Sequence, residues 1–435
     1  MSSDTIFALS SGQPPAAIAV MRVSGPRASE AMMALVGEPV EARRASLRTL
    51  RASDGNVLDQ ALVLWFPGPA TATGEDLLEL HLHGGRAVVR VVEMALTTLR
   101  GVRPAIAGEF TRRAFENGRI DLAEAEGLAD LLSAETEAQR RNAMALADGH
   151  LSRAVEQWQN ELLRISAMVE ADLDFSDEDD VGEGRGNAIA DDLEQLTVSM
   201  EAWLMRPPVE RLKDGLSVVL AGPPNAGKST LINALIQRDA VLTSDIAGTT
   251  RDVVEIPVSL GGVALRLADT AGIRDETGDV IEEMGIERAR AMVDASDILL
   301  WLGAASDAPD HHPATIVIAP QADRFVDDAD WQAGAQKADL KVSAKSGEGM
   351  AALVERIVAL ASTMLPAGGE LALNERQRGA ISDALEALTT DTEQEDLLIV
   401  AERLRLARAA LDQLTGRAST EHMLDALFGR FCIGK

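Results

Sequence analysis

Short apolar runs alternate with segments of helical periodicity in the middle of the chain. Four such runs lie at 216–221, 298–302, 315–319 and 340–342, and turn-forming or polar residues bound them. Runs of this length predict buried strands, and the helical segments between them predict crossover connections. Residues 209–365 are therefore expected to form a doubly wound α/β domain, with ligands at the carboxyl ends of its strands.

The residues before this region predict a smaller α/β domain at 1–118. Apolar runs alternate there with amphipathic segments, and Asp54-Gly55 is a hairpin-type turn. The expected strands and helices lie at 18–23, 61–66 and 77–82, and at 27–36 and 86–99, respectively. Taken alone, these patterns say nothing about a ligand.

Helical periodicity dominates the two flanking segments, 119–208 and 366–435. The first segment predicts helices from 122 onward, near 151–172 and at 188–205, with a loop at 174–187; the second predicts helices at 375–388, 396–414 and 419–428. The sequence therefore predicts an α/β + α fold. The domain at 209–365 is inserted into a split α-helical domain, whose two parts are expected to pack as one bundle.

Composition and charge restrict the class of protein. The chain has 435 residues, a net charge of −28 and one cysteine, Cys432. A chain this acidic is not expected to bind nucleic acid strongly by itself. One cysteine excludes an intramolecular disulfide and fits a reducing cytosol. Because we find no leader pattern and no apolar run of membrane-spanning length, we expect a cytoplasmic protein with no membrane span.

The acidic residues are unevenly placed. Acidic and basic residues balance up to Arg119, and the acid excess peaks at 172–183. Such a run is interpreted here as a solvated loop, although it could also be a surface for a partner.

Residues 222–229 carry the most specific motif. They read Gly-Pro-Pro-Asn-Ala-Gly-Lys-Ser and match the phosphate-loop pattern G-x-x-x-x-G-K-[ST] between an expected strand and an expected helix. Glycines let backbone N–H groups turn toward phosphate oxygens, and the helix N-terminus adds the positive end of its dipole. Lys228 is expected to hold the outer phosphates and Ser229 to bind Mg²⁺.

Two motifs of GTPase switches follow in the usual order. Thr250 lies in Gly-Thr-Thr-Arg-Asp at 248–252, and a threonine there can complete the Mg²⁺ shell when a γ-phosphate is present. Asp269 begins Asp-Thr-Ala-Gly at the end of the expected strand 263–268 and can hold Mg²⁺ through water. The N–H of Gly272 can sense the γ-phosphate.

The guanine-reading segment departs from the usual Asn-Lys-x-Asp. Pro320 replaces the asparagine, Gln321 replaces the lysine, and Asp323 is kept. A Ser-Ala-Lys motif at 343–345 is expected to contact the guanine ring as well. We expect weakened guanine affinity and relaxed discrimination, because a lost hydrogen bond costs about 0.5–1.5 kcal/mol net.

The segment between 298–302 and 315–319 is short and contains two prolines and two histidines. It hardly leaves room for a full crossover helix. His311 and His312 are adjacent and have no carboxylate or cysteine pattern beside them, so we interpret them as solvated loop residues rather than as metal ligands.

Taken together, the motifs resemble the MnmE (TrmE) family of tRNA modification GTPases along essentially the whole chain. Outside the nucleotide domain the resemblance rests on Asp-Thr-Ile at 4–6, Arg-Val-Ser-Gly-Pro at 22–26, Thr-Gly-Glu-Asp at 73–76, His-Gly-Gly at 83–85, Gly-Glu-Phe-Thr at 108–111, Ala-Phe-Glu-Asn-Gly at 114–118, Ala-Glu-Ala-Glu at 123–126 and the terminal Phe-Cys-Ile-Gly-Lys at 431–435. The resemblance implies a homodimer with an N-terminal folate-binding domain, a split helical domain and an inserted Ras-like P-loop GTPase domain.

The resemblance also implies a function. With a flavin-dependent partner protein, the family installs a carboxymethylaminomethyl or aminomethyl group on the wobble uridine of tRNA, using a tetrahydrofolate one-carbon unit. A heterotetramer with that partner, which would supply most of the tRNA-binding charge, is expected. The implied folate site is Arg22, Glu79, Arg119 and Lys435, with arginine at 119 where the family usually has lysine. The family mechanism does not require a thiol at Cys432.

Hydrolysis in the family depends on K⁺ and on pairing of two GTPase domains. The resemblance implies a K⁺ site at Asn225, Ser244, Ile246 and Thr249. It makes Glu282 the residue that orients the attacking water, so that Glu282 and Lys228 are the expected catalytic residues. Without the resemblance, Glu282 is an ordinary carboxylate near a helix N-terminus. The full set of residues expected at the nucleotide is Asn225, Ala226, Gly227, Lys228, Ser229, Thr230, Ser244, Asp245, Ile246, Ala247, Gly248, Thr249, Thr250, Asp269, Thr270, Ala271, Gly272, Asp323, Ser343, Ala344 and Lys345.

Two other functions compete with this enzyme. One is a nucleotide-binding scaffold with poor turnover that holds folate or the partner protein, favoured by the altered guanine-reading segment. The intact catalytic residue types argue against it. The other is a ribosome-assembly GTPase, which shares the central domain but leaves the N-terminal domain and the tail unexplained. The sequence does not tell which tRNAs are modified.

Overall fold

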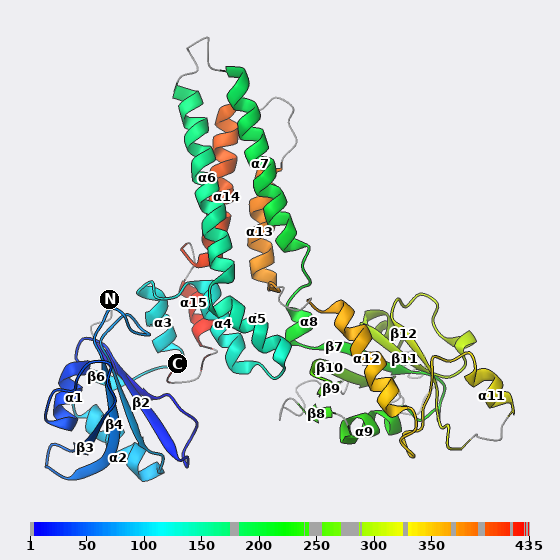
Figure 1. Ribbon diagram of the computed structural model, residues 1–435, viewed down its shortest axis with the longest axis horizontal. Helices are drawn as coiled ribbons and strands as arrows, with labels where there is room; N and C mark the ends of the chain where they lie inside the picture. Colours follow the sequence, from blue (N-terminus) through cyan, green and yellow to red (C-terminus); the bar gives the residue numbers. More distant parts are fainter. Residues whose placement is uncertain are drawn as a thin grey trace. The chain divides into compact units, whose positions relative to one another are not determined.

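The computed structural model divides the chain into two compact units (Figure 1). Unit 1 contains Met1–Ala129, Leu146–Glu170 and Asp396–Lys435, and unit 2 contains Asp130–Ala145 and Ala171–Glu395. The structure describes residues 4–174, 182–238, 240–242, 255–270, 287, 289–324, 329–366, 371–389, 396–417, 421–429, 431 and 434.

A six-stranded sheet forms the N-terminal part of unit 1. Its elements, in chain order, are β1 (Thr5–Leu9), β2 (Ile18–Ser24), α1 (Ala28–Val36), β3 (Ser46–Arg51), β4 (Val57–Phe66), β5 (Leu77–His83), α2 (Arg86–Thr97), β6 (Val102–Pro104) and α3 (Glu109–Glu116). The strand order is β3-β4-β5-β2-β1-β6, and all pairs are antiparallel except β1 with β6. This domain is thus an α/β domain, as the sequence predicts.

Alternating side chains explain the two faces of this sheet. Ala19, Met21 and Val23 of β2 are fully buried in one core with apolar residues of α1 and α2. The opposite face buries Ile6 of β1 against Phe110 of α3 in a smaller core. Successive side chains of a strand point to opposite faces of the sheet, so one strand can contribute side chains to both cores.

Helices from both ends of the helical domain pack together in unit 1. They are α4 (Leu122–Ser133), which begins in this unit, α6 (His150–Asp174), α14 (Leu397–Thr415) and α15 (Glu421–Phe428). Helices α6 and α14 run side by side (Figure 1). Gln159 of α6 donates to Asp412 of α14 at 2.8 Å. Phe428 and Phe431 pack against Ala125 in a separate apolar cluster.

In unit 2, too, helices from both helical segments of the sequence pack together. Its helices are α5 (Glu137–Ala147), most of which lies in this unit, α7 (Gly182–Leu204) and α13 (Glu375–Leu388), with α7 packed on α13. Arg378 of α13 donates to the carbonyls of Leu204 and Arg206 at the end of α7. Pro208 and Leu373 form a β-bridge, so the chain enters and leaves the nucleotide domain at one place. The split helical domain and the inserted domain predicted from the sequence are therefore confirmed.

The nucleotide domain of unit 2 is built on a seven-stranded sheet. Its elements are α8 (Glu210–Lys213), β7 (Leu216–Ala221), α9 (Lys228–Arg238), β8 (Ala240–Leu242), β9 (Glu255–Leu260), β10 (Val263–Asp269), β11 (Ile298–Leu302), β12 (Thr315–Ala319), α11 (Ala329–Ala335), β13 (Leu340–Lys341) and α12 (Met350–Met364). The order is β13-β12-β11-β7-β10-β9-β8, with antiparallel pairing only in β10-β9 and β9-β8 among these strands.

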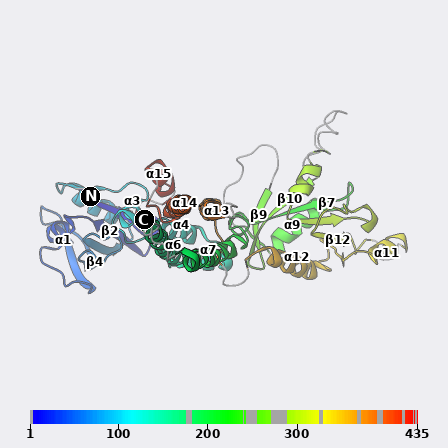
Figure 2. The same ribbon diagram turned by 90° about the horizontal axis from the view of Figure 1, so that it is seen from above.

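Helices cover both faces of this sheet, which is seen from two directions in Figures 1 and 2. Leu235 of α9 and Leu353 of α12 are buried in one core with Val218 and Leu220 of β7. On the opposite face, Val219 is buried with Val293. A central strand that is apolar on both faces is the reason why β7 reads as a continuous apolar run. Within the described residues, no helix is both long and apolar enough to cross a membrane.

Several expected elements are observed at their predicted places, and others differ. Only a 3₁₀ turn, Ala305–Asp307, forms between β11 and β12 in place of a crossover helix, as expected. Helix α7 begins at Gly182 and not at 188, because extending an existing helix adds a hydrogen bond for each residue that it orders. The sequence did not predict β1, β3, β6 or α3, which are short or lack a clear apolar period.

The prediction that both histidines are solvated is wrong for His312. Its side chain is buried, its Nε2 donates to the Ser296 carbonyl at 3.0 Å, and its Nδ1 accepts from the Ala314 amide at 3.3 Å. His311 is exposed and lies 2.8 Å from Asp294. The difference arises because the short β11–β12 connection carries backbone polar groups that need partners when they are buried.

Candidate functional site

The phosphate loop leaves β7 at the carboxyl edge of the parallel strands. Gly222 has φ +142°, and a Cβ added there would lie 2.3 Å from the Leu302 carbonyl oxygen, so only glycine fits. Lys228, which is almost fully buried, donates from Nζ to the carbonyls of Gly222 at 3.0 Å and Pro223 at 3.1 Å. Its ammonium group is thereby held over the loop whose N–H groups are expected to cradle the phosphates.

Two oxygen ligands suited to Mg²⁺ meet beside this loop. Ser229 at the start of α9 donates from Oγ to Asp269 Oδ2 at the end of β10, at 2.5 Å. Hydroxyl and carboxylate oxygens are the ligands that Mg²⁺ prefers, so these side chains fit the ion. Among the described residues, no group of three or more His, Cys, Asp or Glu side chains offers another metal site.

Thr270, also expected at the nucleotide, uses its hydroxyl differently. Its Oγ1 donates to the Leu220 carbonyl at 3.0 Å, and the residue is buried. This bond ties the end of β10 to β7 and so fixes the position of Asp269 relative to the phosphate loop.

A cavity of about 500 Å³ lies where the guanine base is expected. It is lined by Ala226, Gly227, Thr230, Leu231, Leu302, Ile318, Pro320, Gln321, Asp323, Arg324, Val342, Ala344 and Lys345. Ser343, which is fully buried, donates to Asp323 Oδ1 at 2.5 Å. The two base-reading motifs are thus joined, and Ser343 orients the carboxylate that is expected to accept from guanine.

The two residues that replace Asn and Lys in the base-reading segment have their own bonds. The Pro320 carbonyl accepts from Trp331 Nε1 at 3.2 Å. Gln321 Nε2 donates to the carbonyl of Asn225, in the phosphate loop, at 2.9 Å. The base-reading segment is therefore attached to the phosphate loop on one side and to α11 on the other.

The N-terminal candidate residues lie on two neighbouring strands and on the segment after α3. Arg22 of β2 and Glu79 of β5 are opposite each other in the strand register, and Arg22 Nε donates to Glu79 Oε1 at 2.8 Å. His81 Nε2 lies 3.5 Å from the other Glu79 oxygen. Arg119 Nε donates to the Thr71 carbonyl at 3.1 Å.

Arg119 also lines a polar cavity of about 510 Å³ in unit 1. Other charged residues of its lining are Asp121, Glu124, Arg153, Glu156 and Arg417. Burial, with the nearby Asp121 carboxylate, raises the pKa of Glu124, although a hydrogen bond from the Asp121 amide opposes this shift. Arg119 therefore lies between the loop at 71–76 and a cavity large enough for a small molecule.

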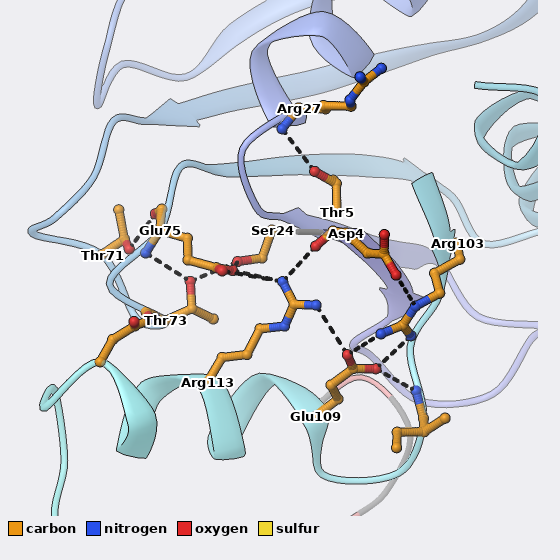
Figure 3. Close-up of polar contacts among 12 residues, drawn as sticks. Asp4, Thr5, Ser24, Arg27, Thr71, Thr73, Glu75, Arg103, Glu109 and Arg113 are labelled. Carbon is orange, nitrogen blue, oxygen red and sulfur yellow. Dashed lines mark hydrogen bonds and ion pairs between the residues drawn. The ribbon is translucent and has the colours of Figure 1, made fainter. Parts of the chain in front are cut away.

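The loop at 71–76 connects these candidates. The Ser24 and Thr73 hydroxyls lie 2.7 Å apart, and Ser24 also donates to Glu75 Oε2 at 2.9 Å (Figure 3). Asn117 Nδ2 donates to the Thr73 carbonyl at 2.7 Å. Because Ser24 is two residues after Arg22 and Asn117 is two before Arg119, the loop brings both arginines to one region of the domain.

A buried ion network supports this loop from below (Figure 3). Arg113 of α3, with a side chain 3% exposed, donates to Glu75 at 3.0 Å, to Glu109 at 3.1 Å and to the Asp4 carbonyl at 2.9 Å. Arg103 of β6 makes two bonds to Glu109, at 2.6 and 2.9 Å. Arginine suits such a place because its planar group donates in several directions.

The electrostatics of the network favour the charged forms. Burial by itself raises the pKa of Glu109, but hydrogen bonds from Arg103, the Ile106 amide and Arg113 outweigh it and hold the pKa below its usual value. The same bond to Glu109 raises the pKa of Arg103. The network is thus a set of paired charges rather than a group prepared for acid–base chemistry.

The C-terminal tail returns to the β1–β2 end of the same domain. Gly434 has φ +99°, and a Cβ added there would lie 2.1 Å from the Leu9 carbonyl oxygen. Ser10 Oγ donates to the Gly434 carbonyl at 2.7 Å. Leu9 pairs with Met21, next to Arg22, so the residue before Lys435 is packed close to the strand that carries Arg22.

A number of predicted site residues lie outside the described residues. They are Ser244, Asp245, Ile246, Ala247, Gly248, Thr249, Thr250, Ala271, Gly272, Glu282 and Lys435, together with Cys432. Of the four implied K⁺ ligands, the structure therefore describes Asn225, and of the four implied folate residues it describes Arg22, Glu79 and Arg119.

Sequence reasoning missed Arg113 and the bond made by Gln321. The signal for Arg113 was present as a basic pair, Arg112-Arg113, one helical turn after Glu109, but its burial depends on the packing of α3. The bond from Gln321 depends on a backbone conformation that the sequence does not reveal.

Comparisons with known proteins agree with this arrangement. A model of the MnmE helical domain matches residues 122–432, and a model of the GTP-binding protein TrmE N-terminus matches residues 5–119. The tRNA modification GTPase MnmE of Sphingopyxis alaskensis is 58% identical over 420 residues, which cover 95% of this chain and 100% of that protein.

Other relatives are similar over the same length. The MnmE proteins of Rhizorhabdus wittichii and Erythrobacter litoralis are 57% and 55% identical, covering 100% and 99% of this chain and 97% and 100% of those proteins. Since the helical-domain model spans most of the chain and these relatives cover nearly all of it, the chain belongs to the MnmE (TrmE) family and is a GTP hydrolase that acts in tRNA modification.

Proposed function

We propose that this protein is a K⁺-stimulated GTPase, activated when two of its GTPase domains pair within a homodimer. With a flavin-dependent partner, it installs a carboxymethylaminomethyl or aminomethyl group on the wobble uridine of tRNA, from a tetrahydrofolate one-carbon unit. We place this reaction in the cytoplasm. The domains would be 1–118 for folate and dimerisation, 119–208 with 366–435 as the helical domain, and 209–365 for GTP.

The observation that carries the proposal is the grouping of Lys228, Ser229, Asp269 and Asp323 along one edge of the sheet. Lys228 would hold the outer phosphates, and Ser229 would bind Mg²⁺ with Thr250 while Asp269 is held to Ser229 by its hydrogen bond. Asp323, oriented by Ser343, would accept hydrogen bonds from guanine. Mg²⁺ and K⁺ supply positive charge that offsets charge developing on the transferred phosphoryl group.

The remaining roles are assigned on the family resemblance. Asn225 would bind K⁺ with Ser244, Ile246 and Thr249, and Glu282 would orient the attacking water. The backbone carbonyl of Asn225 accepts a hydrogen bond from Gln321. This bond supports a defined position of the Asn225 side chain in the phosphate loop.

The folate site would combine Arg22, Glu79, Arg119 and Lys435. Two guanidinium groups and an ammonium group suit the carboxylates of a folate, and Glu79 suits the N–H groups of its pterin ring. The support for this site is the hydrogen-bonded loop at 71–76 and the close packing of Gly434 on Leu9.

The experiment is a reconstitution with the flavin-dependent partner, tRNA, GTP and a tetrahydrofolate labelled in its one-carbon unit. We expect label in the tRNA that depends on GTP and on K⁺. The K228A variant, with the same partner and tRNA, serves as the control for GTP dependence. Label that appears equally without GTP would contradict the proposal, and absence of label together with retained folate and nucleotide binding would favour the scaffold.

A further inference from the structure

One hydrogen bond joins two unusual backbone positions in the nucleotide domain. Gln321 Nε2 donates to the Asn225 carbonyl at 2.9 Å. Gln321 has φ +59° and Asn225 has φ +61°, and within the described residues the one other non-glycine residue with positive φ is Arg43. Such conformations are disfavoured for residues with a Cβ, and they persist where the surroundings hold them.

The bond between Gln321 and Asn225 also lies where the base cavity meets the phosphate loop. Gln321, Ala226 and Gly227 all line the cavity of about 500 Å³. A Cβ added to Gly227 would lie 3.6 Å from Gln321 Nε2, so the amide passes directly along the phosphate loop. A base bound in the cavity would cover this amide and exclude water, which strengthens a hydrogen bond.

The chemistry of the acceptor restricts what can stand at position 321. A carbonyl oxygen needs a donor, which a glutamine amide or a lysine ammonium group supplies and a carboxylate or a thioether does not. Glutamine thus lacks the charge of the usual lysine but keeps a donor aimed at the phosphate loop. The expected loss of guanine affinity at this position is therefore smaller than the loss of a whole contact.

We propose that Gln321 is a positioning residue that holds the backbone of Asn225 and so couples the base cavity to the phosphate loop. The inference rests on the proposed function, in which the Asn225 side chain binds K⁺. It adds that a base in the cavity strengthens the bond, and that the bond fixes the loop from which Asn225 reaches the ion.

A series of variants at one position tests this coupling in the full-length protein. Q321M keeps the length of the side chain without a donor, Q321E offers an acceptor, and Q321K restores a donor. We would measure GDP affinity with a fluorescent GDP, and then the K⁺ concentration that gives half-maximal GTP hydrolysis. Q336A, an exposed glutamine of the same domain that does not line the cavity, is the matched control.

The expected result is a ranking set by the donor. Q321M weakens GDP binding about 3- to 10-fold, the effect of one hydrogen bond, and raises the half-maximal K⁺ concentration. Q321E is expected to bind GDP more weakly than Q321M does, because its carboxylate repels the Asn225 carbonyl oxygen. The GDP affinities of Q321K and Q336A stay within about 2-fold of that of the parent protein. Melting temperatures of all variants are expected to agree, so a change in folding does not produce this ranking.

Two outcomes would overturn the inference. One is a Q321M protein that binds GDP and responds to K⁺ as the parent does. The other is a Q321K protein as impaired as Q321M. If the parent protein hydrolyses GTP equally in K⁺ and Na⁺, the K⁺ part of the proposed function fails, and the ranking in GDP affinity still decides whether Gln321 holds the loop.

Discussion

The N-terminal domain and the nucleotide domain use their buried cations in opposite ways. In the N-terminal domain Arg113, 3% exposed, is bound by two carboxylates, Glu75 and Glu109. In the nucleotide domain Lys228, 7% exposed, donates to backbone carbonyls of its own loop. Two carboxylates neutralise the charge of Arg113, whereas the two carbonyls that accept from Lys228 add no opposing charge. Burial alone therefore does not tell a structural cation from a functional one.

The largest effect is expected when Arg113 is replaced. R113M removes the ion partner of Glu75 and leaves Glu109 paired with Arg103 alone, so we expect about 3 to 5 kcal/mol less stability, measured by urea unfolding. GTP hydrolysis by the folded protein should stay within about 2-fold, because the network does not belong to the nucleotide domain.

The neighbouring arginine is the matched control. Arg112 is more exposed and pairs with Glu116 and Asp425, so R112M should cost about 1 kcal/mol or less. Equal losses for the two variants would mean that the buried network is not what stabilises this domain.

The next largest effect is expected at Lys228, where activity and not stability should be lost. K228A should lower kcat/KM for GTP by about 100-fold or more, as removal of a group that stabilises transition-state charge does. Its melting temperature should remain close to that of the parent protein. Phosphate release and thermal unfolding, measured on one preparation, check both parts, and a large loss of stability with retained turnover would reverse the assignment.

A smaller effect is expected at Arg119, whose Nε donates to the Thr71 carbonyl and whose charge is expected to bind a folate carboxylate. R119A should weaken binding of a tetrahydrofolate about 10- to 100-fold, the range for a hydrogen bond from a charged group. R119K should recover most of this loss, since it keeps the charge, although it loses the fork geometry. Isothermal titration measures both, and unchanged folate affinity in R119A would remove this residue from the site.

The smallest effect is a dependence of stability on pH through Glu109. Its pKa is lowered in the folded protein, so its contribution is fully present above the ordinary carboxyl pKa of about 4.3 and is lost as the pH falls through the lower, folded-state pKa. Glu124, whose pKa is raised by burial, has a dependence of the opposite sign. A plot of unfolding free energy against pH, measured between pH 3 and 6 (a range set by that ordinary pKa of about 4.3), should be flatter for E109Q than for the parent protein. Parallel plots would exclude Glu109 as the source of the pH dependence.

The two domains also differ in how much the sequence revealed. Strands β7, β11 and β12 are observed at the expected bounds, because each is a short apolar run bounded by turn-forming or polar residues. In the N-terminal domain β1 and β3 were missed, and the roles of Arg22 and Glu79 came from resemblance. Their pairing depends on strand register between segments far apart in the sequence, which local patterns do not encode.

Single side chains were harder to predict than elements. The burial of His312 and the bond from Gln321 to Asn225 both depend on how a connecting segment folds back on its domain. Residue type indicated the chemistry available at these positions. Which partner each side chain finds is decided by backbone conformation, including the positive φ at Gln321.

Phosphate release from GTP and from ATP, each in KCl and in NaCl at equal ionic strength, tests the proposed K⁺-stimulated GTPase activity. We predict fast release from GTP in KCl, slow release from GTP in NaCl, and slower release from ATP than from GTP, since Asp323 is positioned to read guanine while Pro320 and Gln321 are expected to relax the discrimination. Equal rates in both salts, or equal use of GTP and ATP, would contradict the account of a K⁺-stimulated GTPase.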